Sequence, residues 1–144
     1  MPDAFGRSWP AGSRRRLKRA ESDYFGSSMA LKRKPSQKQK CFLEVKNVTL
    51  VRQDSIAEFP DAITSRGTKH LRELINAKKK GYESYILYLI QRDDCKSFKI
   101  AEDIDREYKK TFDTALKSGV KILCYDCKLN NEEIIINNQI YYEK

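Results

Sequence analysis

The chain has 144 residues, which is enough for one domain with its own apolar core. No run of apolar residues is long enough to span a bilayer, and no apolar stretch follows the early arginines, so the sequence predicts neither a membrane protein nor a secretory signal. The net charge is +9, with a balance of +8 in residues 1–40 and +1 in residues 41–144. A basic excess favours polyanionic partners such as nucleic acid, and here the excess lies in the first forty residues.

Residues 1–40 are predicted to be a basic, mostly disordered tail. Gly, Pro, Ser, Arg and Lys fill this segment, and its apolar residues Leu17, Phe25 and Leu31 are isolated and follow no helical or strand period. Such a segment buries too little surface to offset its ordering entropy. Two interpretations remain: the tail is native to the protein, or it consists of foreign residues joined ahead of a truncated domain.

The pattern changes at Cys41, where an ordered domain spanning residues 41–144 is predicted to begin. Residues 41–52 have apolar side chains on both faces, as in a β-strand covered from two sides. The later predicted elements are a helix from Thr64 or Ser65 to the stop signal Gly81, a strand at 83–91, a helix at 105–118 before Gly119, a strand at 120–127, and a hairpin of 133–136 with 139–142. This order predicts an α/β fold.

The first strand carries Glu44 and Lys46, two residues apart on a face that is otherwise apolar. Charged groups on an apolar face need a partner or a metal ion. One interpretation is a nuclease site, in which the carboxylate holds a divalent cation and the lysine stabilises the reacting phosphate. Mg²⁺ suits such a site because it prefers oxygen ligands, and Mn²⁺ is a second choice. The other interpretation is an ordinary ion pair, since the tripeptide E-x-K is common.

Several separated segments resemble the C-terminal domain of the sugar fermentation stimulation protein A (SfsA) family. They cover roughly residues 41–143, in the order and spacing typical of the family. The similar segments are FLEVKNVTL at 42–50, FPDA at 59–62, TSRGTKHLREL at 64–74, LIQRDDC at 89–95, and the strand at 119–125.

The resemblance implies an α/β fold related to the PD-(D/E)xK restriction endonucleases, with a three-layer-like mixed sheet and flanking helices. It implies non-specific DNA binding as the leading function, together with the regulation of sugar metabolism that the family name suggests. Glu44 and Lys46 match the (D/E)-x-K element. Whether the chain is an enzyme stays open, the alternatives being a Mg²⁺-dependent DNA or RNA phosphodiesterase and an inactive fragment.

Two features depart from the family pattern. Relatives carry an N-terminal OB-like domain that this sequence does not encode. They also place an aspartate on the strand before the E-x-K strand, and the nearest candidate here is Asp23, in a segment that does not resemble a strand. Without that ligand a metal ion would be held weakly, and the strand bearing Glu44 would become an unprotected edge.

Further candidates come from the second family motif and the ends of strands. Asp61 is either a third catalytic and metal-binding carboxylate or a turn residue before the first helix. Arg66, Lys69 and His70 lie in the first helical turns, where they either contact phosphate or form a solvated basic face. Arg92 follows the second strand and either lines a cleft or ends the strand.

The four cysteines carry no predicted metal site or disulfide. Cys124 and Cys127 form a C-x-x-C on a predicted strand, where positions three apart face opposite sides, so both are expected to be structural. With no sign of export, reduced thiols and a cytoplasmic location are expected. The predicted partner is nucleic acid, with duplex DNA favoured and no membrane.

Overall fold

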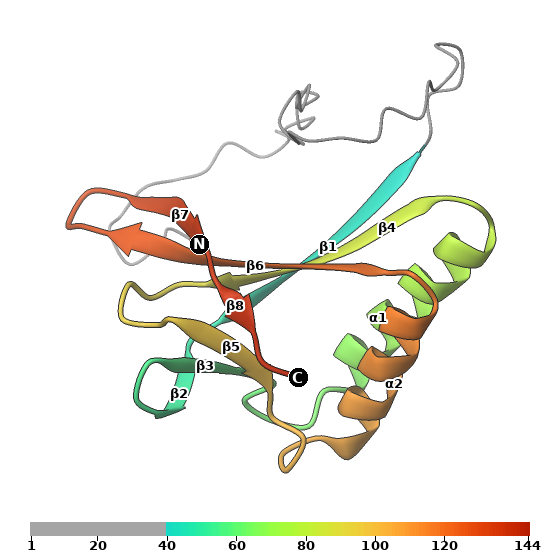
Figure 1. The fold of residues 1–144 in the computed structure, drawn as a ribbon, viewed down its shortest axis with the longest axis horizontal. Helices are drawn as coiled ribbons and strands as arrows, with labels where there is room; N and C mark the ends of the chain where they lie inside the picture. The colour runs from blue at the N-terminus through green and yellow to red at the C-terminus, as the bar shows by residue number, and fades with distance from the viewer. Residues whose placement is uncertain (1–39) are drawn as a thin grey trace, which may run out of the picture. The chain divides into compact units, whose positions relative to one another are not determined.

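The computed structural model describes residues 40–144, which form two mixed β-sheets and two α-helices (Figure 1). The strands are β1 (Cys41–Val48), β2 (Leu50–Gln53), β3 (Ile56–Phe59), β4 (Glu83–Ile90), β5 (Ser97–Ile100), β6 (Lys121–Leu129), β7 (Ile134–Gln139) and β8 (Tyr141–Tyr142), and the helices are α1 (Ser65–Lys79) and α2 (Arg106–Lys117). Neither helix is long and apolar enough to cross a membrane.

The larger sheet, called sheet A below, has the strand order β1-β4-β6-β7. β1, β4 and β6 run parallel, and β7 returns antiparallel to β6. The smaller sheet, called sheet B, has the order β2-β3-β5-β8, with β2 antiparallel to β3 and the other pairs parallel. The predicted α/β class with a mixed sheet and flanking helices is confirmed, and the second sheet is an addition that the sequence did not predict.

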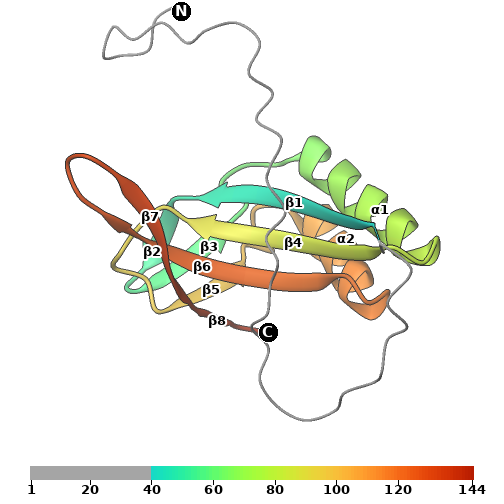
Figure 2. The ribbon, with the colours of Figure 1, turned by 90° about the horizontal axis from the view of Figure 1, so that it is seen from above.

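Both helices lie against the same face of sheet A, with α1 nearer to β1 (Figures 1 and 2). The core between them is formed by alternate residues of β4 and by the inner stripes of the helices. Its largest fully buried side chains include Tyr88, Tyr108, Phe98 and Phe112. The ring of Tyr88 contacts those of Phe98 and Phe112. The Tyr88 and Tyr108 hydroxyl groups are hydrogen-bonded at 2.6 Å, so the polar ends of these two rings are satisfied within the core.

The helix boundaries follow the predicted signals. The Thr64 side chain accepts a hydrogen bond from the Gly67 amide at 3.0 Å and caps α1, and Asp105 caps α2 by accepting from the Tyr108 amide at 2.9 Å. Both helices are followed by a glycine with positive φ, +86° at Gly81 and +87° at Gly119.

Two predictions about elements are wrong. The run 41–52 is broken at Thr49 into β1 and β2, and β1 is an edge strand of sheet A with Phe42, Leu43 and Val45 about half exposed. The predicted hairpin of 133–136 with 139–142 does not form, because β7 continues through Asn137 and Asn138 and pairs with β6. β8 instead joins β5 in sheet B, a long-range pairing that local patterns do not encode.

Candidate functional site

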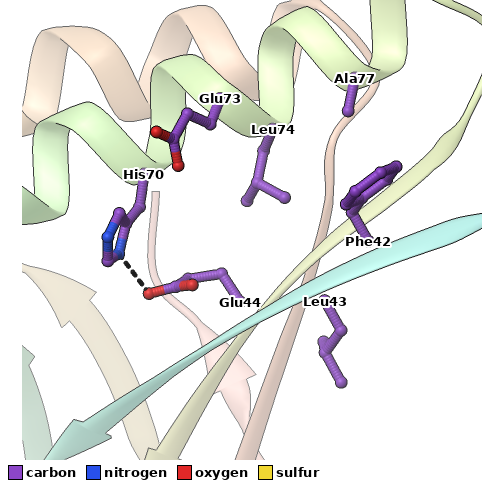
Figure 3. A pocket seen from close by; sticks show the side chains of 7 residues that line it. All are labelled: Phe42, Leu43, Glu44, His70, Glu73, Leu74 and Ala77. Carbon is purple, nitrogen blue, oxygen red and sulfur yellow. Dashed lines mark hydrogen bonds and ion pairs between the residues drawn. The ribbon is translucent and has the colours of Figure 1, made fainter.

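The strand β1 presents Glu44 and Lys46 on the side that faces α1. The Lys46 Nζ lies 2.9 Å from the Glu44 Oε1, and the His70 Nδ1 of α1 lies 2.5 Å from the same oxygen. The Lys46 Nζ and the His70 Nδ1 are 3.2 Å apart, so the three side chains form one cluster. Figure 3 shows His70 reaching from α1 to Glu44 on the strand below it. The structure therefore brings together three predicted site residues, two from one strand and one from a helix.

The cluster is partly open to solvent. The side chains of Glu44, His70 and Lys46 are 28%, 21% and 13% exposed. Burial is the largest single influence on the Glu44 carboxyl and opposes its ionisation, but hydrogen bonds from Lys46 and His70 together hold its pKa below the usual value. Glu44 is thus an ionised carboxylate with two cationic or proton-donating neighbours, and it remains within reach of a ligand.

A pocket of about 330 Å³ opens beside the cluster, between β1 and α1 (Figure 3). Glu44, His70 and Glu73 line its polar part. Its apolar part is lined by Phe42, Leu43, Leu74 and Ala77. A volume of this size lies at the small end of the range for ligand sites. Glu73 was not among the predicted site residues, although its position three residues after His70 places it on the same helical face.

The described residues do not complete a metal site. Within residues 40–144 no three His, Cys, Asp or Glu residues gather in a group that could hold a metal ion. The exposed Asp61 therefore does not join Glu44 and His70 in such a group. Asp23 lies outside the described residues. One carboxylate and one imidazole do not fit Mg²⁺, which prefers several oxygen ligands, so no chemical step through a metal ion is derived from these residues.

The predicted basic residues are spread around the site rather than gathered in it. Arg66 and Lys69 are exposed on α1, and Lys69 has a weak pairing with Glu73 at 3.9 Å. Arg92 follows β4 and forms a two-pronged ion pair with Asp94, with contacts of 2.8 and 2.5 Å. This pair lowers the pKa of the Asp94 carboxyl to about 2, chiefly through the hydrogen bonds from Arg92. Arg66 is thus the most available cation of the predicted set.

The start of α1 is already occupied by side chains of the protein. The Asp105 Oδ2 accepts a hydrogen bond from the Thr64 amide at 2.9 Å, while its Oδ1 caps α2. One buried carboxylate therefore bridges the beginnings of both helices. The sequence predicted Asp105 only as the start of the second helix. The amides of Thr64 and Gly67 are therefore already bonded, and Arg66 is an exposed cation at this end of the helix that could contact a phosphate.

A second charged cluster in sheet B was not predicted at all. Glu58 on β3 is 1% exposed and is paired with Arg52 and with Lys99, whose Nζ lies 3.5 Å from the Glu58 Oε1. The Arg52 Nε donates to Glu58 at 2.7 Å, and the two Nη atoms of Arg52 bond Asp103 at 2.5 and 2.8 Å. A charged residue between the apolar Ala57 and Phe59 was the only local signal of this cluster.

The two cysteines of the C-x-x-C behave as predicted structural residues. Cys124 and Cys127 are both buried and both free thiols. Burial raises the pKa of the Cys124 thiol to about 12, so this sulfur is neither an anion nor a ready metal ligand near neutral pH.

The fold and the cluster define a mixed α/β domain with an accessible carboxylate, a lysine and a histidine at the edge strand of its main sheet. Comparison with known proteins identifies the family. The sequence profile described as the sugar fermentation stimulation protein RE domain matches residues 9–133. The chain belongs to this family.

Curated relatives agree with the profile. A sugar fermentation stimulation protein homolog of Pelagibacter ubique is 56% identical over 103 residues, which are 72% of this chain and 44% of that protein. The homolog of Bartonella henselae is 46% identical over a stretch of the same length. The chain therefore spans less than half the length of these relatives.

A solved structure is also similar. SfsA of Pyrococcus furiosus, determined in complex with Ca²⁺, has a TM-score of 0.66 and 26% sequence identity to this chain. The match covers 71% of this chain and 44% of the archaeal protein. The likeness confirms the mixed α/β fold and agrees with the membership of the SfsA family.

Proposed function

We propose that this domain binds nucleic acid non-specifically, with the phosphate backbone passing over the pocket between β1 and α1. The observation that supports the proposal is the Glu44–Lys46–His70 cluster, which places a lysine and a histidine beside an open pocket. Arg66 and Lys69 are exposed on the same helix that supplies His70 and would extend the basic surface along the strand of nucleic acid.

The balance of charge determines how strong such binding can be. Residues 41–144 have a balance of only +1, so the domain alone contributes few phosphate contacts, whereas residues 1–40 carry +8. We therefore expect the basic segment to supply much of the affinity and the domain to determine where the nucleic acid lies. Affinity falls with salt more steeply when more phosphates are contacted, so the affinity of the full chain should fall steeply as salt is added. The part of the affinity that Lys46 and Arg66 contribute should fall less steeply, because these two residues contact few phosphates.

A second candidate is a Mg²⁺-dependent phosphodiesterase. It is favoured by the adjacent carboxylate and ammonium groups of Glu44 and Lys46, an arrangement suited to a phosphate and its cation. The P. furiosus relative was solved with Ca²⁺, a cation that, like Mg²⁺, takes oxygen ligands. Cleavage by this chain would require further oxygen ligands, from Asp23, from a rearranged Asp61 or from the substrate phosphate.

We propose the cytoplasm, a reducing compartment, as the location of the protein. The free state of all four cysteines fits this location. A part in the regulation of sugar metabolism would follow from DNA binding near the regulated genes, and it depends on the binding proposal.

One gel experiment separates the candidates. Labelled duplex DNA is incubated at low salt with the purified full chain, in Mg²⁺ or Mn²⁺ against EDTA, beside a Lys46→Ala protein. A Lys128→Ala protein is a matched control, because Lys128 is an exposed lysine on β6 that takes no part in the cluster.

Each outcome selects one interpretation. A retarded but intact band, weakened in Lys46→Ala and unchanged in Lys128→Ala, supports binding at the cluster. Fragments that require metal and are absent with Lys46→Ala support the phosphodiesterase. Intact, unretarded DNA in every lane rules out both and leaves the inactive fragment.

A further inference from the structure

The outer side of β7 is an open sheet edge with apolar side chains on both faces. β7 is the last strand of sheet A, and no strand within residues 40–144 pairs with its outer side. All six of its residues are exposed, with Ile134 at 57%, Ile135 at 47% and Ile136 at 54%. Figures 1 and 2 both show the β6–β7 hairpin extending past the end of β4. Three consecutive exposed isoleucines on a projecting hairpin contribute nothing to the core of this domain.

The isoleucine part of the edge, residues 134–136, carries little of the usual protection against pairing. Edge strands commonly bear lysine, proline or an outward bulge that prevents another strand from adding to them. Residues 134–142 contain no charged residue, no proline and no glycine, although 34% of the chain is charged. The ladder becomes irregular just beyond Ile136, because the two steps from Tyr125 to Cys127 of β6 face the three steps from Ile136 to Gln139 of β7. The extra residue of β7 therefore lies at Asn137 or Asn138, and the three isoleucines form the regular part of the strand. An edge of this composition adds a further strand readily.

The hydrogen-bond pattern of the hairpin shows which backbone groups are available. The Asn130 amide donates to the Glu133 carbonyl at 3.1 Å, and Lys128 lies opposite Ile135. Because hydrogen-bonded pairs alternate along an antiparallel ladder, the amide and carbonyl of Ile135 point toward β6. The amides and carbonyls of Ile134 and Ile136 therefore point outward, toward an added strand.

These groups are self-complementary when two copies of β7 meet antiparallel. In an antiparallel pair, two residues that lie opposite each other both point their backbone groups toward the partner strand or both point them away. A two-fold axis between two residues would set neighbours with opposite directions against each other, so the axis must pass through a residue. An axis through Ile135 sets Ile134 against Ile136 of the second copy, and every central pair is isoleucine with isoleucine. An axis through Ile136 would instead oppose isoleucines to Asn137 and Asn138, and an axis through Ile134 would oppose Glu133 to Ile135.

We propose that the chain forms a two-fold dimer in which β7 pairs with β7 of a second copy, centred on Ile135, and joins two A sheets into one. The two copies would bring together six exposed isoleucines, three from each copy, in an interface at the small, weak end of the specific range. The pair sets no like charges opposite each other, because Glu133 meets Asn137 across the interface. The partner is a second copy because the sequence of the edge matches itself.

Single cysteine substitutions test the register directly. In a full chain whose exposed Cys41 is replaced by serine, Ile135→Cys is expected to form a disulfide with itself under mild oxidation, since the two residues face each other in a close, non-hydrogen-bonded pair. Ile134→Cys alone is expected to remain monomeric on a non-reducing gel, because its counterpart is two residues away. A mixture of Ile134→Cys and Ile136→Cys proteins is expected to cross-link.

Light scattering tests the dimer without a covalent bond. The unmodified chain is expected to have twice the mass of one copy, and Ile135→Lys is expected to weaken the dimer at least about tenfold by opposing two like charges. The matched control is Ile63→Lys, a change at an isoleucine that is 81% exposed in a loop, which should leave the dimer intact. Single-copy mass at every concentration, or equal cross-linking by Ile134→Cys and Ile135→Cys, would overturn the proposal.

Discussion

Two glutamates of this domain occupy matching local settings but different environments. Glu44 on β1 and Glu58 on β3 each lie on a strand, and each contacts two basic side chains. Glu58 is 1% exposed, and its partner Arg52 is held in turn by Asp103. Glu44 is 28% exposed and lines a pocket. Glu58 is enclosed by its partners, whereas Glu44 can exchange its partners for a ligand.

This difference separates an enclosed charge from an accessible one. Enclosing a carboxylate is expensive unless it is fully paired, and the Glu58 cluster ties together β2, β3, β5 and the loop before α2. The Glu44 cluster leaves one side of the carboxylate open to solvent, beside the pocket. Charge content alone does not distinguish the two clusters, whereas solvent access does.

The largest expected effect is on stability, from Glu58→Ala. Removing the carboxylate takes away the shared partner of Arg52 and Lys99, whose side chains are 39% and 30% exposed and can be solvated in its absence. The lost charge-assisted hydrogen bonds should cost about 2–3 kcal/mol of unfolding free energy. Urea unfolding measures this cost. Asp103→Asn is the control, because Asp103 is 65% exposed and its loss should cost much less. Equal costs for the two changes would contradict the enclosed role of Glu58.

The opposite pattern is expected for Glu44→Gln. If the domain cleaves nucleic acid, the rate should fall at least about a hundredfold, because Glu44 would hold the cation that stabilises the reacting phosphate. The unfolding free energy should change by only about 1 kcal/mol or less, since this ion pair is partly solvated. Kinetics and urea unfolding on the same preparation check both statements. A large loss of stability would make Glu44 a second structural charge.

Asp105, another carboxylate, allows the effect of burial to be separated from the effect of pairing with cations. Asp105 is 5% exposed and is held by two backbone amides, those of Thr64 and Tyr108. Asp105→Ala should cost about 1–2 kcal/mol, the value for losing a helix cap, and less than Glu58→Ala. Thr64→Ala removes one capping bond and should cost about 1 kcal/mol. Thermal unfolding of both variants ranks the three costs.

The smallest expected effect is a pH dependence at Glu44. Its folded pKa lies below the value near 4.5 of an unfolded chain, so its contribution is complete above that value and is lost as the pH falls through the folded pKa. The difference in unfolding free energy between the unmodified protein and Glu44→Gln should therefore shrink as the pH is lowered toward about 3. A difference that grows in acid would mean that Lys46 and His70 do not stabilise the carboxylate.

Much of the fold followed from local signals in the sequence. The two helices begin and end at the predicted caps and glycines, since capping needs only residues within one turn. The strands β4 and β6 were predicted from their apolar runs. The strands β3 and β5 were missed because each has only four residues, too few to establish a period. The failed hairpin at 133–142 shows that a strand's partner is decided by distant residues.

The candidate site was predictable only in part. The E-x-K pair lies on one strand, and its spacing alone puts Glu44 and Lys46 on the same face. His70 was predicted on the helix as a phosphate contact, but its position 2.5 Å from Glu44 depends on how α1 packs across β1. The pocket and the place of Glu73 in it depend on the same packing.

The sequence by itself determined the family, the α/β class, the helix ends and the side-by-side charges of β1, because each depends on motifs or on residues within one turn or one strand. The tertiary structure alone decided that Glu58 is enclosed, that Asp105 bridges two helices and that Asp61 stays apart from Glu44. These outcomes depend on contacts between distant residues, such as Thr64 with Asp105, 41 positions apart, or Arg52 with Asp103, 51 positions apart. Such contacts are set by the packing of whole elements, which no local pattern records.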